Sequence, residues 1–264
     1  MSDSSRSHFV LIPSYNTGRK LLATVREARN YWHPVWVVVD GSTDGTTESL
    51  QALADQDPGL SVLVLAQNQG KGAAILHGLR EAERAGFTHV LTMDADGQHP
   101  AHKIPEFMAA SAANPAALIL GLPVFDASAP SLRLHGRKIS NGLANLETLW
   151  AGIGDALCGF RVYPVGPLRD IMERQRWMRR FDFDPEAATR LCWRGLRPIN
   201  VEAPVKYFGP DEGGVSHFNY VRDNALLAWM HLRLLPQFVL GLPGQLWRRA
   251  IRPRRLVNRP FQNS

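Results

Sequence analysis

The sequence predicts an α/β protein in which helices flank a mainly parallel sheet. Short runs rich in Val, Ile and Leu alternate with amphipathic stretches over the first half of the chain, as in a βαβα series. The apolar runs do not alternate strictly with polar residues, as expected for strands covered on both faces. Polar residues gather directly after these runs, and open parallel sheets bind their ligands beyond that end of the strands.

Each element follows from its own pattern. The apolar runs that predict strands occupy 9–13, 35–40, 61–66, 88–94 and 116–121. Helical patterns fill the gaps at 21–28, 46–55, 70–86 and 102–114, and the second of them begins with capping-type residues. Later in the chain we expect helices at 133–152 and 167–174 and a strand at 198–208.

Size and cysteine content narrow the class of protein. A chain of 264 residues with 45% hydrophobic content can bury one large core or two modest ones. Cys158 and Cys192 show no CxxC spacing, so neither a disulfide framework nor a thiolate zinc site is indicated. A reducing compartment fits best. The first apolar run is too short for a signal-peptide core and fits a first strand better.

The C-terminal region concentrates positive charge. The chain has a formal net charge of +6, and no Asp or Glu follows Asn224. That region contains seven arginines: Arg233, Arg248, Arg249, Arg252, Arg254, Arg255 and Arg259. Such a tail suggests an anionic partner, either lipid headgroups or nucleic acid, although it can also serve only for solubility. The apolar stretch 224–249 is interrupted by charges and prolines, so we expect it to be interfacial or core-packed rather than transmembrane.

The segment "MDADGQHP" at 93–100 carries the densest chemistry. Gly97 and Pro100 indicate that the strand ends here and turns, which can bring Asp94 and Asp96 onto one site. Oxygen ligands of this kind suit Mg²⁺ or Mn²⁺, with Gln98 or His99 as a further ligand, and such ions usually keep positions open for substrate phosphates. An ordinary Asx-rich turn would show the same sequence.

Two other segments suggest nucleotide binding. In "VVVDGSTDGT" at 37–46, Asp40 ends a strand and can accept hydrogen bonds from a base or ribose, although a plain strand and capped helix would look the same. In "NQGKGAAILHGL" at 68–79, glycines and Lys71 stand at a predicted helix start, which favours phosphate binding. The spacing matches neither a P-loop nor a GxGxxG dinucleotide fold.

Taken in order, these segments and "VLIPSYN" at 10–16 closely resemble family-2 inverting glycosyltransferases. The DAD-x-QHP form looks most like the polyprenyl-phosphate sugar synthases related to dolichol-phosphate mannose synthase. "CGFRVYP", "FDFDPEAATRL" and "GGVSHF" continue the resemblance. It implies a GT-A, Rossmann-like domain, which we expect over residues 1–222. The apolar and arginine-rich sequence of 223–264 is expected to form a basic amphipathic helical extension that associates with a membrane.

The resemblance also implies roles for individual residues. Pro13, Tyr15 and Asp40 would line the nucleoside, with Lys71 near the nucleotide. Asp94 would hold the donor, and Asp96 and Gln98 would coordinate the Mg²⁺ or Mn²⁺ that neutralises the leaving diphosphate. Thr17 and Val39 stand where the synthases usually carry Glu and Asp, so a UDP-linked and a GDP-linked donor both remain open.

Two kinds of acceptor remain open as well. A lipid phosphate is already anionic and needs no strong base, whereas a hydroxyl needs a carboxylate to take its proton. The phosphate case predicts an anion cradle made of Arg133, Arg137, Ser140, Arg161 and His217. The hydroxyl case makes Asp182, Asp184 and Glu186 candidate bases. Of these, Glu186 aligns best with the family's acidic residue.

The expected function is therefore transfer of a sugar from a nucleotide-diphosphate sugar to a lipid-linked or other hydrophobic acceptor. The enzyme is expected to lie on the cytoplasmic face of a membrane, held by its basic tail on the anionic surface. No nucleic-acid partner is expected. A sugar nucleotidylyltransferase would carry a Gly-rich first loop, which "IPSYNTGRK" lacks. A non-enzymatic membrane or nucleic-acid adaptor would leave the ordered acidic segments without a purpose.

Overall fold

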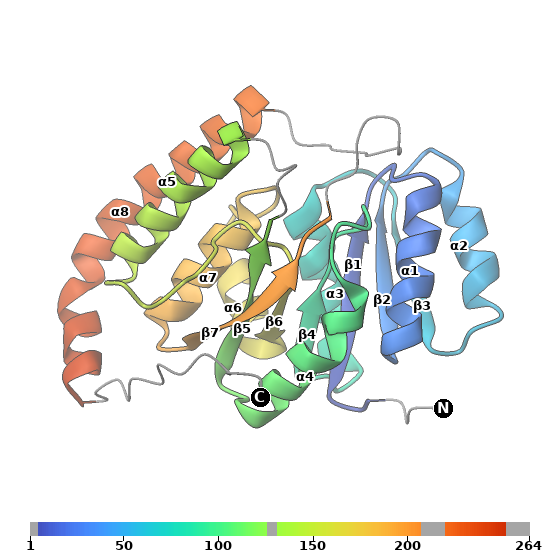
Figure 1. Ribbon diagram of the computed structural model, residues 1–264, viewed down its shortest axis with the longest axis horizontal. Helices are drawn as coiled ribbons and strands as arrows, with labels where there is room; N and C mark the ends of the chain where they lie inside the picture. The colour runs from blue at the N-terminus through green and yellow to red at the C-terminus, as the bar shows by residue number, and fades with distance from the viewer. Residues whose placement is uncertain (1–4, 126–130, 207–219, 252–264) are drawn as a thin grey trace.

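The computed structural model describes residues 5–125, 131–206 and 220–251. A seven-stranded sheet forms its centre, in the order β3-β2-β1-β4-β6-β5-β7 (Figure 1). The strands are β1 (His8–Ser14), β2 (Val35–Asp40), β3 (Leu60–Leu65), β4 (His89–Thr92), β5 (Ala117–Val124), β6 (Arg161–Pro164) and β7 (Arg197–Pro204). All neighbouring pairs are parallel except those that β6 forms with β4 and β5, so the predicted mainly parallel α/β fold is confirmed.

Helices cover both faces of this sheet. They are α1 (Arg19–Tyr31), α2 (Thr46–Ala54), α3 (Lys71–Arg84), α4 (Ile104–Ala113), α5 (Ser131–Glu147), α6 (Val165–Glu173), α7 (Phe183–Trp193) and α8 (Tyr220–Ile251), with a short 3₁₀ turn, η1 (Ala101–Lys103), before α4. Two apolar clusters result, one on each face. The first joins β1 and β4 to α3, α6 and α7, and the second joins the central strands to α1 and α4.

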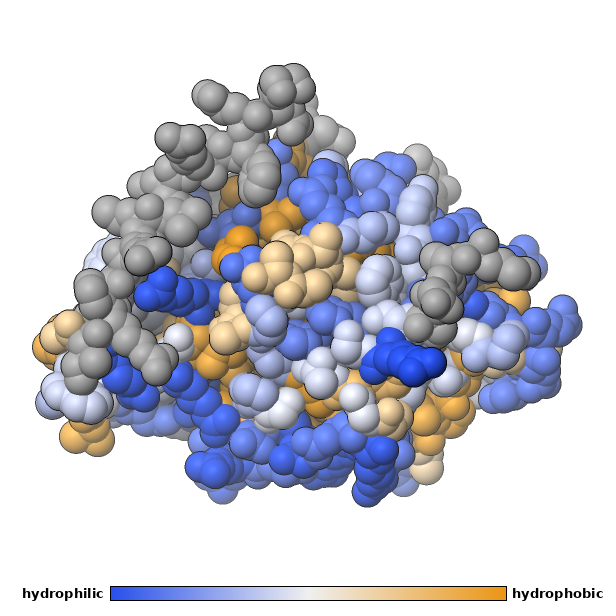
Figure 2. All heavy atoms as spheres, turned by 90° about the horizontal axis from the view of Figure 1, so that it is seen from below, coloured by the Kyte–Doolittle hydropathy of each residue, from blue (hydrophilic) through white to orange (hydrophobic). Residues whose placement is uncertain are grey.

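The carboxyl ends of the parallel strands β1 and β2 meet at one edge of the sheet. In parallel pairing Val10 lies opposite Val35 and Ser14 opposite Val39, so both strands end together. The polar residues that follow β1, β2, β3 and β4 therefore share that edge, which is the usual place for a ligand in open α/β sheets. Figure 2 shows the opposite end of the molecule, seen from below. Hydrophilic residues lie along much of the edge of this view, and apolar residues lie between them.

The long helix α8 lies beside α5 at the far side of the sheet from α1 and α2 (Figure 1). Its buried side packs Leu227, Met230 and Leu234 against Leu157 and Trp193. Positions three and four residues apart lie on one face of a helix, and the outward face of α8 is made of such positions. They are Val221, Ala225, Ala228, Leu232, Leu235, Val239, Pro243 and Leu246.

The outward face of α8 reverses the usual pattern of a surface helix. Its members are exposed and apolar, with Val221 at 80% and Leu232 at 64% exposure, whereas Asp223 and His231 on the inward side are buried. The predicted extension is thus helical, but its described part is apolar on the outside rather than basic. Within the described residues, Val221–Arg248 is long and apolar enough to cross a membrane by length and composition.

Candidate functional site

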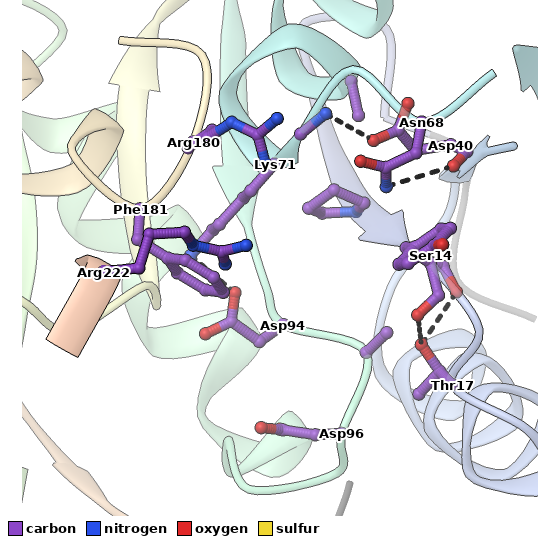
Figure 3. A pocket seen from close by; sticks show the side chains of 15 residues that line it. Ser14, Thr17, Asp40, Asn68, Lys71, Asp94, Asp96, Arg180, Phe181 and Arg222 are labelled. Carbon is purple, nitrogen blue, oxygen red and sulfur yellow. Dashed lines mark hydrogen bonds and ion pairs between the residues drawn. The ribbon is translucent and has the colours of Figure 1, made fainter. Parts of the chain in front are cut away.

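A cavity of about 410 Å³ lies at the carboxyl ends of the strands (Figure 3). It is lined by Pro13, Ser14, Tyr15, Thr17, Asp40, Asn68, Gly70, Lys71, Ala74, Asp94, Ala95, Asp96, Arg180, Phe181 and Arg222. The structure therefore brings together all the residues that the sequence assigned to the donor, and it adds Asp96 to them. Gln98 is not among the lining residues.

Asp40 fixes the start of α3 beside this cavity. Its two carboxylate oxygens accept the backbone N–H groups of Gln69 at 2.9 Å and Gly70 at 2.7 Å. Gly70 adopts φ +100°, and a Cβ there would lie 2.4 Å from the carbonyl oxygen of Arg179, so only glycine fits. Burial raises the pKa of Asp40, although both backbone hydrogen bonds oppose that effect. Asp40 is thus a structural anchor of the loop before α3 as well as a cavity wall.

Lys71 stands at the centre of a buried charge network. Its ammonium lies 2.6 Å from Asp94 Oδ1 and 2.7 Å from Asp184 Oδ2, and the other oxygen of Asp94 lies 3.1 Å from His99 Nε2. Burial acts to raise the pKa of Asp94, but the charges of Lys71 and His99 outweigh it and hold that pKa well below its usual range. Burial likewise acts against the charge of Lys71, and Asp184 and Asp94 reverse this, so its pKa is raised.

Asp96 occupies the turn after Asp94 and faces the same cavity. Its Oδ1 accepts the backbone N–H of Gln98 at 3.0 Å, while the carbonyl of Gln98 accepts the N–H of Lys206 at 3.1 Å. The Gln98 contacts described are thus backbone contacts that shape the turn. Burial, and then the charge of Asp94, raise the pKa of Asp96.

The carboxylates near Lys71 are of the kind that can bind a divalent cation. Asp94 and Asp184 lie 2.6 and 2.7 Å from the Lys71 ammonium, and Asp96 lines the same cavity as Lys71 and Asp94, so among these four groups negative charge exceeds positive charge. Asp184 Oδ1 is also buried without a hydrogen-bond partner among the residues that the structure describes. Mg²⁺ is typically held by one or two carboxylates together with substrate phosphates, rather than by a complete protein cage. Within the described residues, no group of three or more His, Cys, Asp or Glu side chains is arranged so as to hold a metal ion by itself.

Among the cavity residues that were not predicted from the sequence, three come from segments outside the parallel βα units. Arg180 and Phe181 come from the segment before α7, and Arg222 comes from the first turn of α8. Neither segment follows a strand of the parallel series, so the rule that locates sites at strand ends did not apply to them. The available signal was the cluster of arginines in "RWMRRF" directly before the acidic segment.

Three of the five residues predicted to form the acceptor cradle, Arg137, Ser140 and Arg161, make structural contacts instead. Arg137 pairs at 2.6 Å with the buried Asp155, and Arg161 is fully buried, with hydrogen bonds to the carbonyl oxygens of Asp184 at 2.6 Å and Asp155 at 2.9 Å. Ser140 is buried with its Oγ 3.5 Å from His231 Nε2. These three side chains hold the loop 151–160 and helices α5, α7 and α8 together. The side chain of Arg133, and His217, lie outside the described part of the structure.

The candidate bases are also engaged. Glu186 is fully buried and lies 2.8 Å from Arg190 Nε and 3.0 Å from Arg233 Nη2, away from the cavity lining. The carboxylate of Asp182 accepts the backbone N–H groups of Met178 and Arg180. Asp184 is paired with Lys71 as described above. Each of these three carboxylates therefore makes structural contacts that the sequence did not reveal.

The sequence of this chain is similar to a known protein family and to individual known proteins. Residues 9–172, more than half of the chain, match the model of glycosyl transferase family 2. The undecaprenyl-phosphate mannosyltransferase of Micrococcus luteus is 28% identical over 211 residues, which cover 75% of this chain and 82% of that protein. The polyprenol monophosphomannose synthase of Mycolicibacterium smegmatis is 31% identical over 172 residues, which cover 62% of this chain and 63% of that protein.

Solved structures share the fold. TarS 1–349 of S. aureus, in complex with UDP-GlcNAc, superposes with a TM-score of 0.57 at 15% identity, covering 94% of this chain and 76% of that one. Glucosyl-3-phosphoglycerate synthase of Mycobacterium tuberculosis, in complex with Mn²⁺, UDP-glucose and phosphoglyceric acid, gives 0.55 at 14% identity, covering 91% and 80%. These likenesses confirm the predicted GT-A fold. Because the family model matches residues 9–172, more than half of the chain, the chain belongs to glycosyl transferase family 2.

Proposed function

We propose that this protein is an inverting glycosyltransferase that moves a sugar from a nucleotide-diphosphate sugar to a polyprenyl phosphate. The observation that carries the proposal is the convergence of Asp40, Lys71, Asp94 and Asp96 on one cavity at the carboxyl ends of the strands. The names of the relatives in Micrococcus and Mycolicibacterium support the lipid phosphate as acceptor.

The donor occupies the cavity along its length. Its nucleoside lies at the end formed by Pro13, Tyr15 and Asp40, and its diphosphate lies near Lys71 and the start of α3. The N-terminus of α3 favours phosphate because its first N–H groups and its dipole are positive. Asp94 is held in its ionised form by Lys71 and His99, so it can accept hydrogen bonds from sugar hydroxyls.

A divalent cation, Mg²⁺ or Mn²⁺, would be held by Asp96, supported by Asp94. When bound, it would neutralise charge that develops on the leaving diphosphate. The acceptor phosphate oxygen attacks the anomeric carbon on the side opposite the diphosphate. The new carbon–oxygen bond forms as the bond to the diphosphate breaks, so the configuration at the anomeric carbon is inverted. The residues that line the cavity hold the sugar donor and the phosphate acceptor in line for this attack and exclude water.

The ion pairs of the candidate bases also favour a phosphate acceptor. A hydroxyl acceptor needs a carboxylate to take its proton, whereas a lipid phosphate is anionic near neutral pH. Glu186 is buried between two arginines, and Asp184 holds Lys71. We therefore assign Glu186 a positioning role for Arg190 and Arg233, in place of the base that its alignment suggested.

The protein would work at the cytoplasmic face of a membrane, where nucleotide sugars and lipid phosphates meet. Helix α8 would lie in the membrane plane, with its outward face in the headgroup and acyl boundary. Its inward face is held to the body by His231, which lies 2.8 Å from Glu147, and by Arg233 on Glu186. A helix crossing the membrane would have to give up these buried contacts.

The experiment measures release of UDP or GDP from a panel of nucleotide sugars with Mn²⁺ or Mg²⁺, with and without undecaprenyl phosphate. We expect one donor to turn over, to depend on the metal and to be stimulated by undecaprenyl phosphate, whereas Asp94→Asn is inactive. If no nucleotide sugar binds or reacts under any of these conditions, the proposal is wrong.

A further inference from the structure

A groove continues the donor cavity toward α8. It is lined by Arg180, Arg222, Asp223, Leu226 and Trp229, and it is more open than the cavity itself. Arg180 and Arg222 also line the donor cavity, so the two spaces share a wall. The groove therefore connects the reacting centre with the helix that presents the protein's apolar outward face.

The two ends of the cavity differ in charge. Figure 3 shows Ser14, Thr17, Asp40 and Asn68 on one side, Arg180, Phe181 and Arg222 on the other, and Lys71 with Asp94 between them. The first side offers hydroxyl, amide and carboxylate groups, which suit a nucleoside. The second offers two guanidinium groups, which suit a phosphate because each can donate two parallel hydrogen bonds to it. The arginine side is also the side on which the groove opens.

Asp223 organises this arginine side. Its carboxylate is fully buried and accepts hydrogen bonds from Nε of Arg222 at 2.9 Å and from Nη2 at 3.2 Å, while the Arg222 side chain is 56% exposed. A buried carboxylate that binds one edge of a guanidinium restricts the rotamers of that arginine. The buried acid thus holds Arg222 at the boundary between the cavity and the groove.

The groove walls are apolar where they leave the arginines. Trp229 is 49% exposed and packs edge-on against Trp177 at 6.4 Å between ring centroids, and Leu226 lies one turn before it. The outward face of α8 begins beside them with Val221, Ala225 and Leu232. The groove thus offers arginines first and apolar side chains beyond them, which matches an amphiphile with a phosphate head and a hydrocarbon tail.

We propose that Arg180 and Arg222 hold the phosphate of a polyprenyl-phosphate acceptor, and that Leu226 and Trp229 contact the first isoprenoid units of its tail. The inference rests on the proposed function and assigns the acceptor subsite to residues other than those expected from the sequence. The phosphate then lies beside Asp94, within the cavity that also holds the donor sugar. A phosphate monoester carries more negative charge than a diester headgroup, and two arginines match that higher charge.

The test compares two kinds of binding in the full chain. Flotation with phosphatidylcholine vesicles that contain undecaprenyl phosphate measures acceptor binding, and calorimetry with UDP and GDP in the presence of Mn²⁺ measures donor binding. We expect Arg180→Gln and Arg222→Gln each to weaken undecaprenyl-phosphate binding by about tenfold or more. Nucleotide affinity should stay within about twofold of the wild type for Arg222→Gln. Arg180 packs near Gly70 at the start of α3, beside the proposed position of the diphosphate, so Arg180→Gln should weaken nucleotide binding as well. Arg248→Gln, an exposed arginine at the other end of α8, is the matched control and should change neither.

The outcomes separate this inference from the function on which it rests. A loss of nucleotide affinity in Arg222→Gln as large as its loss of undecaprenyl-phosphate binding would assign Arg222 to the donor diphosphate and overturn the inference. Unchanged binding of undecaprenyl phosphate by both variants would also overturn it. So would equal binding to phosphatidylglycerol vesicles, because that result indicates a general headgroup site. Failure of the wild type to bind any nucleotide would instead overturn the proposed function. Circular dichroism confirms that each variant is folded, and Arg222→Lys, which keeps the charge, should bind with intermediate affinity.

Discussion

The ammonium of Lys71 lies 2.6 Å from a carboxylate oxygen of Asp94, which joins the first residue of α3 to the turn after β4. The two residues come from different βα units, and both side chains are largely buried, at 13% and 32% exposure. Because a buried ion pair has lost much of its hydration, its partners depend on each other far more than those of a surface pair do. The pair therefore determines both the shape and the charge of the cavity.

Replacing Lys71 with Met should destabilise the protein strongly. Asp94 and Asp184 would then be buried carboxylates without their ammonium, and removal of one partner from a buried pair typically costs about 3–5 kcal/mol. Urea unfolding at neutral pH measures the loss. The control is Lys103→Met, since Lys103 pairs with the exposed Glu106 on the surface, and such pairs contribute less than about 1 kcal/mol. Similar losses for both variants would contradict the central role of Lys71.

Asp96→Asn should separate activity from stability. The pKa of Asp96 is raised by burial and by Asp94, so its charge is unfavourable in the folded state at neutral pH and a neutral amide should preserve or increase stability. Asn can still accept the N–H of Gln98. Transfer activity should fall at least about 100-fold, as expected when a group that stabilises transition-state charge is removed.

Mn²⁺ titration followed by calorimetry, alongside thermal unfolding, tests this separation. Asp55→Asn, in an exposed position after α2, is the control and should alter neither property. Activity of the Asp96 variant close to that of the wild type would exclude Asp96 as the metal ligand.

Most of the fold could be predicted from the sequence because the strands that carry it are short, apolar and separated by amphipathic helices. The prediction of 35–40 as a strand matches β2 in full. The meeting of Asp40 and Asp94 in one cavity could be predicted for a related reason, since Asp40 ends β2 and Asp94 comes shortly after β4, and the carboxyl ends of these strands lie at the same edge. Local pattern and topology together decide where such residues lie.

The acceptor residues could not be predicted in this way because their partners lie far along the chain. Arg137 looked available for a phosphate, but it pairs with Asp155 in a loop whose path the sequence does not reveal. Arg161 sits on the antiparallel strand β6, inside the core. An arginine's role depends on which carboxylate or carbonyl folds against it, and this is a tertiary property.

Acid should destabilise the fold through a pair of stacked histidines. His8 on β1 and His89 on β4 face each other with ring centroids 4.4 Å apart, and burial and then the charge of His89 lower the pKa of His8 to about 4 from 6.5. The folded state thus binds this proton less readily than the unfolded chain does. The stabilising contribution is complete above about pH 6.5 and is lost as the pH falls toward about 4.

Urea unfolding at several pH values between neutral and about pH 4.5 tests this effect against His8→Phe, which keeps a ring in the stack but does not titrate. The wild type should lose up to about 3 kcal/mol more than the variant over this range. His102→Phe removes an exposed histidine and should follow the wild type. If the pH dependence of His8→Phe equals that of the wild type, the stack has no such role.

Glu186→Gln should weaken the attachment of α8 rather than abolish chemistry by removing a base. Arg190 and Arg233 would lose a shared buried carboxylate, and Arg233 lies 4.3 Å above the ring of Trp177, close to the segment that supplies Arg180. Stability should therefore fall by several kcal/mol, and KM for the lipid acceptor should rise more than kcat falls. The pH profile of kcat should keep its shape. Loss of a limb from that profile, with KM unchanged, would restore Glu186 as a general base.

A carboxylate placed on the outward face of α8 should release the protein from membranes without unfolding it. Leu232 and Val239 are 64% and 58% exposed, so Leu232→Glu and Val239→Glu create no buried charge in solution. At a bilayer the same carboxylates would have to enter the headgroup and acyl boundary, which opposes binding. We expect vesicle binding to fall about tenfold or more, while soluble nucleotide binding is unchanged. Gln237→Glu adds an equal charge at an exposed position off that face and should bind vesicles nearly as well as the wild type. Equal losses for all three variants would mean that net charge, not the apolar face, governs membrane binding.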